Sequence, residues 1–168
     1  MTVLPIVRYP DPRLRQKAEP VGPVDGTVRD LARDLLDTMR AAPGVGITGP
    51  HVGVLRRVVV IDLGEETGGV RTYLDPHITW ASSEMARFVE GSVSMPGVTE
   101  ELERPARVRV AYRDLDGVRH EEEAGGFLAT CLQHEVDQLD GIFWIDRLSR
   151  LKRERVIKRY EKLQRRSG

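Results

Sequence analysis

The chain has 168 residues, of which 40% are hydrophobic and 31% charged, a composition that excludes wholesale disorder. Lys and Arg number 26, as do Asp and Glu, so the formal net charge is zero and a uniformly basic nucleic-acid-binding surface is excluded. The length favours one domain over residues 1–168, and the single cysteine excludes an intramolecular disulfide. No signal sequence or membrane-spanning run of apolar residues is evident, which predicts a cytoplasmic protein without membrane contact.

The first half of the chain predicts one helix followed by strands. The first 26 residues are rich in proline and should run extended over the surface. Thr27 is a candidate N-cap for a helix whose apolar residues recur at helical spacing up to Met39, and Pro43-Gly44 ends it. Strands are expected over Arg57–Asp62, Thr72–Trp80, Met85–Val89, Ala106–Tyr112 and Val118–Glu123, with a hairpin turn at Asp116-Gly117.

The second half predicts two more helices. One begins at Gly125-Gly126 and ends near Leu139, before Asp140-Gly141. The last begins near Ser149, with an expected apolar face of Leu151, Ile157, Tyr160 and Leu163. Residues 149–168 contain nine basic and two acidic residues, a net +7 that the rest of the chain balances with −7. The order of elements favours an α+β domain with mostly antiparallel sheets.

The middle helix contains the one local pattern that suggests catalysis. His134 and Gln138 are four residues apart and so lie on one helical face, with Glu135 beside them. Two ligands at this spacing with an adjacent glutamate are typical of hydrolytic metal sites, where the glutamate moves protons for bound water. Taken alone, an ordinary helical His–Glu pair explains the pattern better.

Three segments together resemble the peptide deformylase family, metal-dependent amidases that remove the N-formyl group from new bacterial polypeptides. Residues Gly44–His51 (GVGITGPH) are similar to the family motif GxGxAAxQ, and Glu90–Ser94 (EGSVS) to EGCLS. Residues Gln133–Gly141 (QHEVDQLDG) are similar to QHExDHLxG. The likeness extends over about residues 4–150. It implies a peptide-deformylase-like fold, with antiparallel sheets around the motif-bearing helix and a C-terminal helix.

The resemblance also implies where the active site departs from the family. The family holds its metal through the Cys of EGCLS and both His of HExDH, and these positions are Ser92, His134 and Gln138 here. The family glutamine that contacts the reacting carbonyl is His51, whereas the family acid–base glutamate is retained as Glu135. A protonated hydroxyl and a carboxamide are weak donors compared with thiolate and imidazole, so we expect affinity for zinc or iron to fall by orders of magnitude.

Two arrangements of the site follow from these substitutions. The exchange of glutamine and histidine between positions 51 and 138 would let His51 and His134 hold an ion, completed by Ser92, Gln138 or water. Alternatively, the site holds no metal, and His51, Ser92, His134 and Glu135 form a hydrogen-bonded polar cluster. A serine nucleophile at Ser92 is less favoured, since the second glycine of GxSxG is absent.

Other residues are expected to bind substrate. The resemblance implies that the Val93 amide donates to a substrate carbonyl, and Gly44 and Gly46 would let a peptide approach the backbone. Apolar pocket candidates are Ile47, Phe88, Val89, Cys131 and Leu132, with Glu90 and Gly91 beside them, although most could belong to the core. Cys131 is expected to be a structural cysteine, and Arg104 is expected to pair with an acid such as Glu90.

Three functions remain open from the sequence. The first is an amide hydrolase acting on N-formyl or N-acyl amino acids or peptides, with ordinary deformylation weak or absent; the retained Glu135 favours this reading. The second is an inactive homologue that binds peptide, and the third a metal-independent enzyme of secondary metabolism that reuses the pocket. The basic C-terminal helix resembles the deformylase helix that docks on ribosomal RNA, and a solvated helix face explains it equally well.

Overall fold

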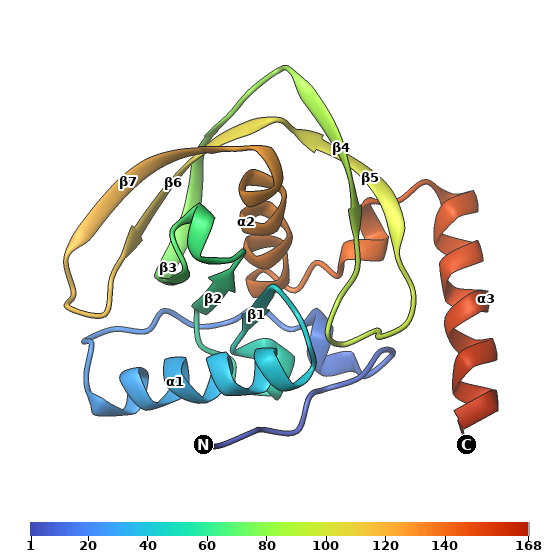
Figure 1. Ribbon diagram of the computed structural model, residues 1–168, viewed down its shortest axis with the longest axis horizontal. Helices are drawn as coiled ribbons and strands as arrows, with labels where there is room; N and C mark the ends of the chain where they lie inside the picture. The colour runs from blue at the N-terminus through green and yellow to red at the C-terminus, as the bar shows by residue number, and fades with distance from the viewer. Residues whose placement is uncertain (168) are drawn as a thin grey trace.

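The computed structural model describes residues 1–167 and contains two antiparallel sheets packed around a central helix (Figure 1). The order is α1 (Gly26–Ala41), β1 (Gly46–Thr48), β2 (Val58–Asp62), β3 (Val70–Ala81), β4 (Met85–Glu90), β5 (Glu100–Pro105), β6 (Arg107–Arg113), β7 (Arg119–Gly125), α2 (Gly126–Leu139) and α3 (Arg150–Ser167). Five strands pair in the order β1-β2-β3-β6-β7, and β4 pairs with β5 in a separate hairpin. The α+β class with mostly antiparallel sheets is therefore confirmed.

Helix α2 lies between the two sheets and contacts strands of both (Figure 1). Its backbone begins where β7 ends, and Gly126 there has a φ of 59°. At the other end Gly141 has a φ of 78°, and a side chain at that position would collide with the backbone of Arg15, so glycine is required. The predicted bounds of this helix are confirmed, and most of its residues are buried.

Helix α1 packs against the large sheet, and its first residue was predicted two positions late. The N-cap is Asp25 and not Thr27, because the Asp25 carboxylate accepts a hydrogen bond from the Val28 amide, which places Thr27 inside the helix. Val28, Leu35 and Met39 are buried against β1, β2 and β3. This packing fixes the loop from Ala41 to β1, which carries the first glycine-rich motif.

Two strands were not predicted, and both flank α2. Strand β1 has only three residues, all buried, so it shows no alternation. Strand β5 has the sequence EELERP, whose charges conceal a period of two in which Leu102 and Arg104 face inward. The other predicted strands are present with ends shifted by one or two residues, and the turn at Asp116-Gly117 is confirmed, with a Gly117 φ of 80°.

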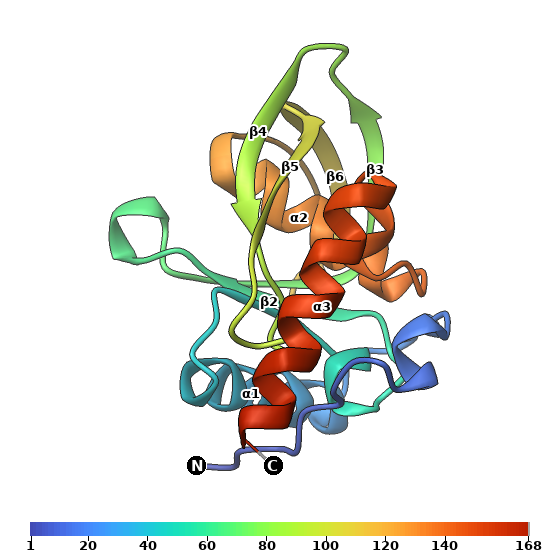
Figure 2. The same cartoon turned by 90° about the vertical axis from the view of Figure 1, so that its right-hand side faces the viewer.

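Helix α3 lies across the outside of the β4–β5 hairpin (Figure 2). Val156 and Tyr160 are buried in a core cluster with residues of the hairpin loop, while Ile157 and Leu163 are partly buried beside them. Leu151 was wrongly assigned to this face and is 59% exposed. It lies five residues before Val156, which turns it about 140° around the helix axis, away from the hairpin.

The N-terminal arm links segments that later form the site. The Val7 amide donates to the His51 carbonyl at 2.8 Å, and the Tyr9 amide donates to the Ser94 carbonyl at 2.8 Å. The arm is extended over the surface as predicted, apart from a short 3-10 turn at Pro12–Arg15. None of the helices in residues 1–167 combines the length and the apolar character that crossing a membrane requires.

Candidate active site

The three motif segments meet around one cavity of about 450 Å³. The first motif contributes the Gly44–Gly46 approach to β1 and His51 from a short 3-10 turn, Pro50–Val52. The second contributes the end of β4 and the loop through Val93, and α2 contributes Cys131, His134 and Glu135. The cavity thus lies between an edge strand of the large sheet and β4 of the hairpin, with α2 as its inner wall.

His134 is anchored by a buried network of charges. Its Nδ1 lies 2.9 Å from Glu90 Oε1, and Arg104 holds both oxygens of the same carboxylate at 2.7 and 3.0 Å. The predicted pairing of Arg104 with Glu90 is present, and Arg104 also donates to Asp137, which Arg147 holds in turn. Since His134 Nδ1 is occupied by Glu90, its Nε2 is the ring nitrogen left for other partners.

Glu135 is a buried carboxylate without a hydrogen-bond partner for Oε1 within residues 1–167. Burial, together with the negative charge of Glu90, raises its pKa to about 7, although nearby His134 opposes the shift. The pKa of His134 is raised as well: burial lowers it, but the charges of Glu135 and Glu90 outweigh burial. A side chain at Gly46 would collide with the Glu135 carboxylate, so glycine is what lets β1 pack this closely against it.

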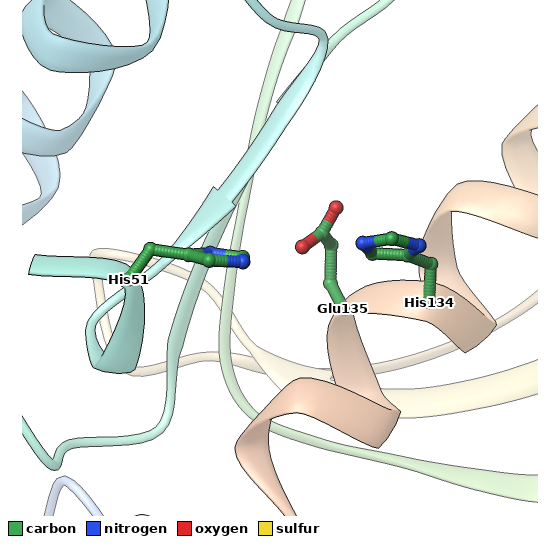
Figure 3. A group of neighbouring side chains, drawn as sticks. All are labelled: His51, His134 and Glu135. Atoms are coloured by element: carbon green, nitrogen blue, oxygen red, sulfur yellow. The ribbon is translucent and has the colours of Figure 1, made fainter. Parts of the chain in front are cut away.

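His51 faces Glu135 from the opposite wall (Figure 3). The ring points toward the Glu135 carboxylate, and His134 lies on the other side of that carboxylate. One ligand atom from each of these three residues lies within 4.8 Å of the others, so His51 and His134 do share the cavity. His51 is 1% exposed, and burial, followed by the charge of His134, lowers its pKa to about 3. Its imidazole is therefore neutral near neutral pH.

Ser92 and Gln138 are both hydrogen-bonded to backbone groups. Ser92 Oγ accepts a hydrogen bond from the Ser94 amide at 3.1 Å, and Ser92 lines the cavity. Gln138 Nε2 donates to the Leu14 carbonyl at 2.8 Å, and Gln138 does not line the cavity. The Ser92 contact is local to the loop, whereas the Gln138 contact joins α2 to the N-terminal arm. Both are made by side chains expected at ligand positions.

Most predicted substrate-binding residues line the cavity. Those that do are Gly44, Gly46, Val89, Glu90, Gly91, Val93 and Cys131. Ile47 does not, because its side chain is fully buried in the cluster under α1, and Phe88 and Leu132 are also absent from the lining. Gly46 and Ile47 are neighbours on β1 and so face opposite ways, which places Ile47 in the cluster under α1 and not in the cavity.

Sequence reasoning missed Phe127 and Thr130, which line the cavity from the start of α2. The spacing of the sequence could have found them, because Phe127 and Thr130 lie on the same helical face as Cys131 and His134. Arg8 at the rim was also missed. It comes from the N-terminal arm, whose path over the site no local pattern predicts.

Comparison with known proteins identifies the family. The family model for polypeptide deformylase matches residues 3–154. A Brucella melitensis protein named Peptide deformylase-like is 63% identical over 165 residues, 98% of this chain and 100% of that protein. A Methylocella silvestris protein named Peptide deformylase is 47% identical, covering 96% of this chain and 85% of that protein.

Solved structures agree. The peptide deformylase of Legionella pneumophila superposes with a TM-score of 0.92 at 35% identity, covering 99% of this chain and 98% of that one. The peptide deformylase of Ehrlichia chaffeensis in complex with actinonin superposes with a TM-score of 0.89 at 37% identity, covering 98% of this chain and 99% of that one. The chain belongs to the peptide deformylase family, hydrolases that remove N-formyl groups from peptides and use a divalent metal. The resemblance found in the three motifs is thereby confirmed.

Proposed function

We propose that this chain is an amide hydrolase for N-formyl or N-acyl amino acids or peptides, with a rewired active site that performs ordinary deformylation weakly or not at all. The observation that carries the proposal is Glu135, a buried carboxylate that lines the cavity and whose Oε1 has no hydrogen-bond partner in residues 1–167. Desolvating such a group is costly, and a site that only binds peptide has little use for it.

The donors around Glu135 do not suit the family metal. Of the family's three ligand positions, only His134 offers a strong donor, since Ser92 and Gln138 carry weak donors that already bind backbone groups. Closely similar relatives support a distinct subgroup: proteins 54–63% identical are named Peptide deformylase-like, and those at 43–47% Peptide deformylase. The divalent ion, zinc or iron, therefore has no part in the steps below.

The chain's own residues supply a route for hydrolysis. Glu135 takes a proton from water as the water oxygen attacks the carbonyl carbon, and then gives the proton to the leaving nitrogen as the C–N bond breaks. The Val93 amide has no acceptor within residues 1–167, lines the cavity and would donate to the carbonyl oxygen. The pKa of about 7 suits Glu135 to both proton transfers near neutral pH.

The cavity walls favour an extended peptide. Strand β1 is an edge of the large sheet, and β4 belongs to a two-stranded sheet with β5. Both strands contribute residues to the lining. An extended chain could add to either edge through backbone hydrogen bonds. This same feature supports the second candidate, an inactive homologue that binds peptide. A metal-independent enzyme of secondary metabolism would use the same walls with other chemistry.

The test is release of formate or acetate from formyl- and acetyl-Met-Ala-Ser by chelator-treated protein. We expect measurable turnover, well below that of the metal-loaded Legionella pneumophila enzyme, and a loss of about 100- to 10,000-fold in Glu135→Gln. Glu123→Gln, an exposed glutamate on β7, is the matched control and should leave the rate unchanged. Unchanged turnover in Glu135→Gln would refute the catalytic assignment. Peptide binding with no turnover at all would favour the inactive homologue.

Contact of the C-terminal helix with the ribosome stays a prediction. The exposed side of α3 carries basic residues, among them Arg155, Lys158 and Lys162. Arg150 and Arg159 already have acidic partners, Glu154 and Glu100. A face of this charge would be attracted to phosphates, and it would equally remain solvated in a free protein.

A further inference from the structure

The His51 ring is held by the residue that ends β1. The Thr48 backbone amide donates to His51 Nδ1 at 3.0 Å, and the Thr48 hydroxyl lies 3.0 Å from the same nitrogen. A backbone N–H can only donate, so Nδ1 must carry a lone pair and no proton. The assignment follows from the identity of the donor, and a ring flip would break the contact.

A neutral imidazole without a proton on Nδ1 carries it on Nε2. His51 Nε2 is buried, has no acceptor within residues 1–167, and belongs to a ring directed toward the cavity and Glu135 (Figure 3). An unsatisfied N–H at such depth is unfavourable, and a ligand oxygen in the cavity would satisfy it. A protonated nitrogen has no lone pair for a metal ion, so His51 lacks the donor that the grouping with His134 and Glu135 would need.

We infer that Thr48 fixes His51 as a hydrogen-bond donor to the acyl oxygen of a bound amide, and that the three-residue cluster does not serve as a metal site. The catalytic part of this inference rests on the proposed function, whereas the protonation pattern of the ring does not. His51 and the Val93 amide, which both line the cavity, would then polarise one carbonyl oxygen, with Glu135 as the proton carrier.

The protonation pattern can be read directly. We would record nitrogen spectra of the full-length protein labelled at its four histidines, with His51→Gln identifying the His51 signals. The expected result is a proton on Nε2 and none on Nδ1, unchanged by one equivalent of zinc. A proton on Nδ1, or loss of the Nε2 proton on adding zinc, would overturn the inference.

Kinetics separate a donor from a metal ligand. His51→Leu should lower kcat/KM by about 100-fold or more, as removal of one oxyanion donor does, whereas His51→Gln keeps an N–H donor and should stay within about 10-fold of wild type. A metal ligand would give large losses in both variants, together with loss of bound zinc. Equal losses therefore contradict the donor role. If the wild type proves inactive, the proposed function fails while the nitrogen spectra still decide the state of His51.

Discussion

The side chain of His134 on α2 and the side chains of Ser92 and His51, which come from two other segments around the cavity, differ in how they are held. On the α2 wall, His134 keeps an orienting carboxylate, Glu90, which Arg104 holds in turn through a buried pair. Away from α2, the Ser92 hydroxyl accepts a hydrogen bond from the Ser94 amide, and the His51 ring accepts one from the Thr48 amide. Under the proposed function, the network that orients His134 is kept while the donors at positions 92 and 138 are replaced, which is feasible because orientation and coordination depend on separate residues.

The sharpest way to break this comparison is to restore the family residues at positions 51, 92 and 138, the last of which lies on α2. The triple variant Ser92→Cys, Gln138→His, His51→Gln supplies the family's thiolate, second imidazole and carboxamide beside the retained His134. We expect zinc or iron content to rise from near zero to about one ion per chain, since three strong donors then converge. Turnover of formyl-Met-Ala-Ser should rise by about 100-fold or more.

Elemental analysis of protein purified without chelator measures this change. The matched control is Cys131→Ser, which removes the chain's own thiol from the cavity and should leave metal content near zero. A wild-type chain that already carries one zinc or iron ion would show that Ser92 and Gln138 did not abolish binding. A triple variant without metal would show that the family donors together with the Glu90–Arg104 network do not suffice to build a coordination site.

The charge network that anchors His134 on α2 can be broken at Arg104 of β5. Arg104→Met would leave the carboxylates of Glu90 and Asp137 buried without their shared cation, and we expect a loss of about 3–5 kcal/mol in unfolding free energy. Arg87→Met on β4 is the matched control, because Arg87 is 67% exposed and its pairing with Glu103 is worth under about 1 kcal/mol. Urea unfolding of both variants gives the two values, and equal losses would mean that the network does not stabilise the fold.

The sequence predicted α2 and the pairing of Arg104 better than it predicted the contacts of Gln138. The bounds of α2, the meeting of the three motifs and the Arg104–Glu90 pair all followed from local patterns and the resemblance. The contact of Gln138 with Leu14 joins residues 124 apart in sequence, so no local pattern encodes it. Strand β5 was missed because its charged residues pair across a hairpin, and Ile47 was misplaced because a three-residue strand does not reveal which face is inward.

The smallest expected effect comes from Glu135→Gln, which tests whether the Glu135 carboxylate is buried without a cation beside it. Its pKa of about 7 lies above the ordinary 4.5, so the folded state disfavours ionisation. Below pH 4.5 the group is protonated in both states and costs nothing, and the cost then grows until pH 7 and stays constant above it. Glu135→Gln removes that cost. From pH 5 to pH 8.5, the unfolding free energy of the variant should therefore rise by about 1–3 kcal/mol relative to that of wild type.

Urea unfolding at the two pH values measures the gain, and Glu123→Gln should show none, because that carboxylate is half exposed on β7. The sign of the effect distinguishes the two arrangements of the site. A bound cation would favour the ionised carboxylate, so Glu135→Gln would then lose stability as pH rises. A gain means that the carboxylate is buried without a cation, which is the state a proton carrier requires to exchange protons near neutral pH.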